Sequence, residues 1–159
     1  MIEITKPKLY IETTVFNYYF LEDTKREDDQ KDTVLLFREI ENGIFESYFS
    51  EIVILEIEGC QEPKRTKMLK LIEDYKIQPI KITEGYERLA KVYIDERVVP
   101  EKKRNDALHI ALASINALDT IVSWNCEHIV KYKTRKFIKL INEALGYKVV
   151  DVNTEKGGA

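Results

Sequence analysis

Four oxygen-bearing side chains stand at the borders of apolar segments, where a charged or polar group is costly to bury without a partner. Glu12 ends the run LYI, and Glu56 lies within IVILEIEG. Asp106 opens the nearly all-apolar DALHIALASINAL, and Asn125 follows TIVSW. Acids crowded together repel and raise one another's pKa unless a cation neutralises them. Ligand sets made only of oxygen select a hard cation such as Mg²⁺ or Mn²⁺ over zinc. The pattern therefore predicts a metal site whose ligands are Glu12, Glu56, Asp106 and Asn125.

Each carboxylate also has a simpler interpretation when it is taken alone. Asp106 at a helix start could cap the helix or interact with its dipole. Glu56 could lie on a solvated helix face, although the neighbouring acids Glu51 and Glu58 fall on other faces at 100° per residue. The prediction of a site therefore rests on the four residues together.

The two histidines are weaker candidates than the acids. His109 lies one helical turn beyond Asp106 and could approach the same crevice, but a hydrogen-bonded structural histidine is the favoured interpretation. His128 follows Asn125 and could contact a phosphate. Neither is needed as a general base, because a metal ion can itself make water nucleophilic.

Several basic and aromatic residues could contact a nucleic acid, although solvated or core positions are the commoner interpretation. Trp124 is expected to pack beside the sheet, and Tyr18 or Tyr19 could stack on an unpaired base if exposed. The basic candidates form two groups: Lys102, Lys103 and Arg104, and Lys131, Lys133, Arg135 and Lys136.

The composition of the 159 residues, 44% hydrophobic and 33% charged, predicts one globular domain over residues 1–152 and a frayed tail over 153–159. A net charge of -3 argues against a protein that coats nucleic acid through overall positive charge, but not against local basic patches. Cys60 and Cys126 form no CxxC pair, so zinc modules and disulfide scaffolds lose their usual support. Without a signal-like start or an apolar run of about 18 residues, we expect no membrane span and a cytoplasmic location.

Short apolar runs alternate with segments of helical period along the chain. Strands are expected at about 9–12, 45–50, 77–83, 119–125 and 147–152, and helices at about 13–20, 34–43, 51–59, 63–75, 84–96, 102–117, 127–132 and 135–145. Thr13 or Thr14 is expected to cap the first helix, and Ser50 the helix that Gly59 ends. The charged run 22–32 reads as a solvated turn. Strands separated by helices predict an α/β fold with three layers, in which helices flank a mostly parallel five-stranded sheet.

In such a sheet, ligands bind outside the carboxyl ends of the strands, especially where the strand order reverses. Glu12 and Asn125 each follow a predicted strand at this end. The two residues could therefore face each other across one crevice.

The order of LYIETTVFNYY, SEIVILEIEGC and NDALHIALASINALDTIVSWNCEHI resembles the PIN-domain family, and within it the toxin-like ribonucleases of VapC type. The resemblance implies an acidic cluster that holds Mg²⁺ or Mn²⁺ for phosphodiester hydrolysis. Glu12 and Thr13 match the family's first acid and the hydroxyl residue after it. Glu56, Asp106 and Asn125 match its other three positions. Thr13 would then position the attacking water or a phosphate oxygen, and Asn125 would orient a water or a ligand.

Two positions depart from the family's pattern: Glu12 stands where Asp is usual, and Asn125 where Asp is common. The sequence predicts a metal-dependent endoribonuclease, the candidate toxin of a type II toxin–antitoxin module, with RNA as substrate and an antitoxin as partner. A homodimer is expected through apolar residues of two helices: Val34, Phe37 and Ile40, and Met68 and Leu69. The alternative is a catalytically weak PIN-like module that binds RNA or a protein. A phosphotransfer receiver or small Mg²⁺ phosphatase lacks an obvious phosphoacceptor Asp.

Overall fold

The computed structural model describes residues 5–125, 131–148 and 150–153. Its sheet has the strand order β3-β2-β1-β4-β5, and all four strand pairings are parallel. In the centre of the sheet, Tyr10 lies opposite Tyr48 on one side and Ile121 on the other. The strands are β1 (Lys8–Ile11), β2 (Glu46–Phe49), β3 (Gln78–Pro79), β4 (Thr120–Val122) and β5 (Asp151–Asn153).

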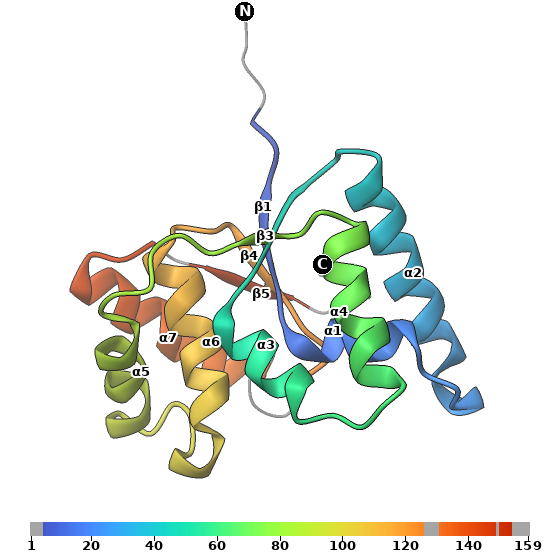
Figure 1. The fold of residues 1–159 in the computed structure, drawn as a ribbon. Helices are drawn as coiled ribbons and strands as arrows, with labels where there is room; N and C mark the ends of the chain where they lie inside the picture. Colours follow the sequence, from blue (N-terminus) through green and yellow to red (C-terminus); the bar gives the residue numbers. More distant parts are fainter. Residues whose placement is uncertain (1–4, 126–130, 149, 154–159) are drawn as a thin grey trace, which may run out of the picture.

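Helices cover both faces of this sheet (Figure 1). The α-helices are α1 (Thr13–Tyr19), α2 (Glu27–Glu41), α3 (Glu51–Glu58), α4 (Lys64–Asp74), α5 (Tyr86–Asp95), α6 (Arg104–Ile115) and α7 (Tyr132–Leu145). Figure 1 shows α1, α2 and α4 on one side and α5, α6 and α7 on the other. The predicted α/β class, with a parallel sheet flanked by helices, is confirmed.

The strand order reverses between β1 and β4, because the chain adds β2 and β3 on one side of β1 and then returns to add β4 and β5 on the other. Helix α1 leaves the end of β1 toward one face, whereas α7 follows β4 on the other face (Figure 1). The crevice between two such strand ends is where open α/β sheets bind ligands.

Helix α6 lies deepest in the fold. Every residue from Asp106 to Ser114 is buried, as the apolar pattern predicts. Ser50 caps α3 by accepting the N–H of Ile52, and Gly59 ends this helix, which also agrees with the prediction. The start of α6 and the body of α3 are therefore held near the carboxyl ends of β1 and β2.

Two predicted elements differ in the structure. The charged run 22–32 is not a turn, since it contains a 3₁₀ turn (Thr24–Arg26) and the first turns of α2. The three acids at residues 27–29 fall in the first turn of α2, where they interact favourably with the helix dipole. Strand β3 is limited to Gln78–Pro79, on the edge of the sheet where a proline without an N–H is tolerated.

Several sequence predictions fall outside the described residues. These are the first part of the predicted helix at 127–132, His128, Cys126, and all of the predicted tail except Asn153. None of the helices within the described ranges combines the length and apolarity that a membrane crossing needs.

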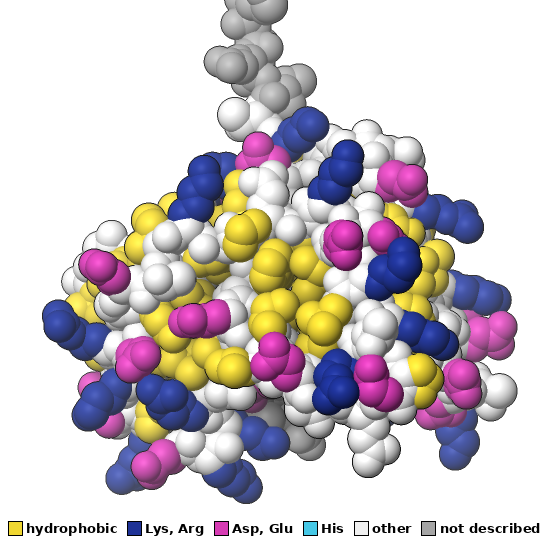
Figure 2. Space-filling model, in the orientation of Figure 1, with side chains coloured by type: hydrophobic (Ala, Val, Ile, Leu, Met, Phe, Trp, Pro, Cys, Tyr) yellow, Lys and Arg dark blue, Asp and Glu magenta, His cyan; other side chains and the backbone are white. Residues whose placement is uncertain are grey.

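Three of the five apolar residues on which the dimer prediction rested are buried within this chain. Phe37 and Met68 are fully buried, and Ile40 is 8% exposed. Val34 and Leu69 are only partly buried, so the homodimer stays a prediction. The exposed large apolar side chains include Leu35 in α2, Leu55 in α3 and Ile82 after β3. Figure 2 shows apolar side chains gathered over the region of β3 and α3.

Candidate metal centre

Glu12 stands at the junction between β1 and α1. Its backbone is still extended, and its carboxylate accepts the N–H of Thr14 at 3.0 Å. Glu12 is thus the N-cap of α1, and the prediction that Thr13 or Thr14 fills this position is wrong. The cap is the last extended residue, and here that residue is the acid itself.

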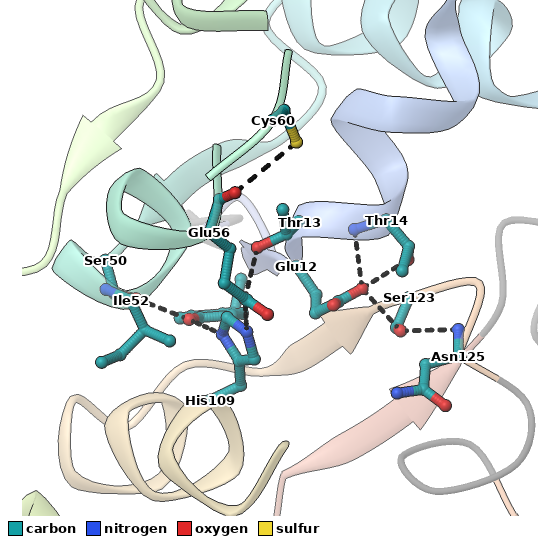
Figure 3. Close-up of polar contacts among 11 residues, drawn as sticks. Glu12, Thr13, Thr14, Ser50, Ile52, Glu56, Cys60, His109, Ser123 and Asn125 are labelled. Atoms are coloured by element: carbon teal, nitrogen blue, oxygen red, sulfur yellow. Dashed lines mark hydrogen bonds and ion pairs between the residues drawn. The ribbon is translucent and has the colours of Figure 1, made fainter. Parts of the chain in front are cut away.

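The carboxylate of Glu12 is buried and held by three donors. Oε1 accepts from the Thr14 N–H, the Thr14 hydroxyl and, at 2.9 Å, the Ser123 hydroxyl (Figure 3). Burial raises the pKa of Glu12, and this effect outweighs the nearby charge of His109 and the hydrogen bonds. A buried carboxylate that resists ionisation is a group that a cation would stabilise in its charged form.

Glu56 faces Glu12 from the middle of α3. Its Oε1 accepts the Thr13 hydroxyl at 2.8 Å and lies 2.5 Å from Nε2 of His109. Burial alone would raise the pKa of Glu56. The hydrogen bond from His109, the charge of that ring and the Thr13 hydroxyl reverse the effect and hold the pKa below its usual value. Glu56 is therefore ionised over the ordinary pH range.

His109 is fully buried between Glu56 and the sheet. Its Nδ1 contacts the hydroxyl of Tyr10, which lies 2.7 Å from the hydroxyl of Ser50. Burial opposes the charged imidazolium, but the hydrogen bond to Glu56 and the charges of Glu12 and Glu56 raise the pKa of His109 above its usual value. The expectation of a hydrogen-bonded histidine is confirmed, because both ring nitrogens have partners.

Glu12, Glu56 and His109 form a cluster in which one ligand atom from each residue lies within 4.8 Å of the others. Two carboxylates and one imidazole are donors that suit a divalent cation, since carboxylates favour Mg²⁺ and Mn²⁺ and imidazole accepts first-row transition metals. The donor set therefore fits a metal ion, although its third member is a nitrogen rather than the predicted oxygen.

The five predicted site residues lie at different distances from this cluster. Glu12 and Glu56 belong to it, and Thr13 donates to Glu56. Asp106 is buried in the first turn of α6, where its charge acts on His109, but it is not a member of the group defined by 4.8 Å. The backbone N–H of Asn125 donates to Ser123, which in turn donates to Glu12. Figure 3 shows the amide of Asn125 beyond Ser123 and not beside the Glu12 carboxylate.

The aromatic residues near the cluster serve packing. Trp124 is buried, as predicted, and stacks on Tyr18 with ring centroids 5.1 Å apart. Tyr19 packs edge-on against Phe37. Tyr18 and Tyr19 were expected to stack on an unpaired base only if they were exposed. Neither side chain is exposed, so this expectation no longer applies.

Comparisons with known proteins show a likeness of fold. No family model matches the sequence, and no curated protein matches it. Among solved structures, FitAcB from Neisseria gonorrhoeae matches with a TM-score of 0.52 and 13% sequence identity, over 91% of this chain and 95% of the other. Similarity at this identity concerns the fold alone, and it supports a PIN-like fold.

Proposed function

We propose that this protein is a metal-dependent endoribonuclease that hydrolyses phosphodiester bonds of RNA. The observation that carries the proposal is the cluster of Glu12, Glu56 and His109, whose ligand atoms lie within 4.8 Å of one another. The cluster stands at the carboxyl edge of the sheet beside the reversal of strand order. The PIN-like fold supports the same chemistry.

Glu12, Glu56 and His109 would hold Mg²⁺ or Mn²⁺, with Asp106 and Asn125 adding ligands directly or through water. When bound, such a cation makes water more acidic and stabilises the negative charge that develops on the attacked phosphate.

The remaining residues of the site orient these donors. Thr14 and Ser123 fix Oε1 of Glu12, and Thr13 fixes Oε1 of Glu56. When Nδ1 of His109 carries the ring proton, it can donate to the Tyr10 hydroxyl, which in turn donates to Ser50, and this is the tautomer whose Nε2 can bind a cation. Such support limits the movement of the donors and keeps His109 able to present Nε2.

FitB, a chain of the FitAcB structure, is the PIN-domain toxin of a toxin–antitoxin pair. On that likeness we propose an antitoxin as partner of this chain and a toxin role for its ribonuclease activity. A homodimer and a cytoplasmic location belong to the same proposal.

A catalytically weak RNA- or protein-binding module is the second candidate. It is favoured by Asn125, a neutral residue beside the site, and by Oε1 of Glu12, which already accepts three hydrogen bonds. Asn125 carries no charge, and the three hydrogen bonds occupy lone pairs of Glu12 that a cation would otherwise use.

Cleavage of a fluorescent single-stranded RNA separates the two candidates. The wild-type chain should cleave in Mn²⁺ and not in EDTA, and Glu56→Gln should lower the rate by at least about 100-fold, since it removes a ligand charge. Asp106→Asn tests the bordering acid in the same assay. Glu58→Gln, on the exposed side of the same helix, is the matched control and should cleave normally. Binding of RNA without cleavage in either metal would support the binding module and contradict the nuclease.

A further inference from the structure

Helix α7 has an uneven distribution of charge. From Lys131, which precedes its first turn, to residue 139 there are five cations and no acid, in a chain whose net charge is -3. These cations are Lys131, Lys133, Arg135, Lys136 and Lys139, and all are exposed. Acids appear only at the far end, at Glu143 in the helix and Asp151 in β5.

The cations of α7 differ from several cations of other helices, which have an acidic partner four residues away. Lys70 lies 2.8 Å from Asp74 in α4, and Lys91 lies 2.7 Å from Asp95 in α5. Within the part of the chain that the structure describes, the five α7 cations form no ion pair of this kind. Cations four residues apart on a helix repel each other. The α7 row is therefore a positive surface that an external polyanion would stabilise.

An aromatic side chain accompanies this row. Tyr132, in the first turn of α7, is 72% exposed. It lines a groove together with Arg135, Lys136 and Lys139, and the groove also contains Leu140, Val150 and the acids Glu143 and Asp151. Proteins that bind single-stranded nucleic acids combine two elements. Cations contact the phosphates, and exposed aromatic rings stack on the bases.

The positive end of α7 lies on the side of the metal cluster. Helix α7 connects the carboxyl end of β4 to the start of β5, so its first turn lies toward the edge of the sheet at which Glu12 stands. Tyr132 is seven residues beyond Asn125, so the Cα atoms of these two residues are about 25 Å apart at most. The acids Glu143 and Asp151 lie toward the opposite edge.

We propose that the groove of Tyr132, Arg135, Lys136 and Lys139 binds the backbone of single-stranded RNA and directs it toward the metal cluster. The inference rests on the proposed function in that RNA is taken as the substrate. It adds the surface that holds the RNA and the preference for an unpaired strand.

Binding without metal tests this surface separately from cleavage. The probe is a fluorescein-labelled oligouridine of twelve nucleotides, measured by anisotropy with the full chain in EDTA at several salt concentrations. Lys136→Gln combined with Lys139→Gln should weaken binding about tenfold and lower the slope of log K against log salt by about 1.4, or 0.7 per lost phosphate contact. Tyr132→Leu should weaken binding about tenfold with an unchanged slope, because stacking involves no counterion release.

The matched control is Lys70→Gln combined with Lys91→Gln, which makes the same change of net charge on α4 and α5. This control should bind as the wild type does. Equal affinity and equal slope for the α7 pair and the control pair would overturn the inference.

The two proposals fail in different ways. Weaker binding by the α7 pair, with no cleavage by the wild type in Mn²⁺ or Mg²⁺, would leave the RNA surface standing and remove the nuclease. Cleavage by the wild type together with unchanged binding by the α7 pair would remove the RNA surface and leave the nuclease.

Discussion

Helix α6 contributes to two buried polar networks that differ in charge and in access to solvent. In its first half, His109 joins Glu56 and Tyr10. In its last turn, Ser114 joins Asn142 and Tyr93. Each network includes one buried tyrosine and connects several elements, so burial and hydrogen bonding alone do not distinguish a functional site from a structural one.

The second network is closed and neutral. Tyr93 donates to Oδ1 of Asn142 at 2.5 Å, and Nδ2 of Asn142 donates to Ser114 at 2.9 Å and to the carbonyl of Lys148 at 3.0 Å. Ser114 donates to the carbonyl of Ile110 at 2.8 Å. These partners connect α5, α6 and α7, and the donors and acceptors satisfy one another without any ion.

The first network is charged and partly open. Glu56 keeps 29% of its side chain exposed. Oε1 of Glu12 accepts from Thr14 and Ser123, and Oε1 of Glu56 contacts Thr13 and His109. Two carboxylates in such a place repel each other, and burial raises the pKa of Glu12. The comparison therefore indicates that the closed network serves stability and the open one serves binding of a cation.

The largest expected effect is on the closed network. Asn142→Ala leaves Tyr93, Ser114 and the Lys148 carbonyl without a buried partner, which should cost about 3 kcal/mol of unfolding free energy and lower Tm by about 10 °C. Thermal unfolding followed by circular dichroism, with and without Mn²⁺, gives both quantities. The response to Mn²⁺ should be that of the wild type, and its loss would show that the two networks are not separate.

Glu12→Gln should remove the stabilisation by Mn²⁺ without lowering the stability of the metal-free protein. Mn²⁺ at 100 times its dissociation constant should stabilise the wild type by about 2.7 kcal/mol and the variant by almost nothing. In EDTA the variant should be at least as stable as the wild type, because the amide replaces a buried acid whose pKa burial has raised. A variant that keeps the full Mn²⁺ response would exclude Glu12 as a ligand, whereas Glu58→Gln should keep it.

Local signals predicted much of this arrangement from the sequence. Ser50 and Gly59 are a capping residue and a helix end that act on their nearest neighbours, and both were predicted correctly. Glu12 and Glu56 were predicted as site residues because each is an acid at the border of an apolar run, and the structure brings them together. The charged run 22–32 misled because a solvated turn and the acidic first turn of a helix have the same composition.

The place of His109 in the cluster was beyond sequence reasoning. Its partner Tyr10 is 99 residues away, and Tyr10 contacts Ser50 across 40 residues of chain. The available signal was the position of His109 one turn after Asp106, on a helix with apolar residues on nearly every face. That signal places the ring near the crevice but does not show that both nitrogens have partners there.

The two tyrosines offer a matched test of smaller size. Tyr93→Phe and Tyr10→Phe each remove one buried hydroxyl and should each cost about 1 kcal/mol of unfolding free energy. Only Tyr10→Phe should weaken Mn²⁺ binding, by about tenfold, because Tyr10 orients His109 whereas Tyr93 contacts no candidate ligand. Calorimetric titration of Mn²⁺ into both variants measures this, and equal affinities would assign Tyr10 to packing alone.

The smallest expected effect is the pH dependence of the two networks in EDTA. The pKa of Glu56 lies below its ordinary value of 4.5, because His109 outweighs burial, so its contribution to stability is present above pH 4.5 and is lost as the pH falls through its folded pKa. The pKa of His109 lies above its ordinary value of 6.5, because Glu56 and the neighbouring acids outweigh burial. Its contribution is complete below pH 6.5 and is lost as the pH rises through the folded pKa.

The stabilisation by this pair should therefore be greatest between pH 4.5 and 6.5 and should decline above that range. The difference in unfolding free energy between the wild type and Glu56→Gln, measured by urea titration from pH 5 to 9, isolates it. The same difference for Asn142→Ala should be constant over this range, because the titratable group of the closed network is Tyr93, whose pKa burial raises to about 12. If this difference for Glu56→Gln does not change with pH, His109 and Glu56 do not form an ion pair. The open network would then be as neutral as the closed one.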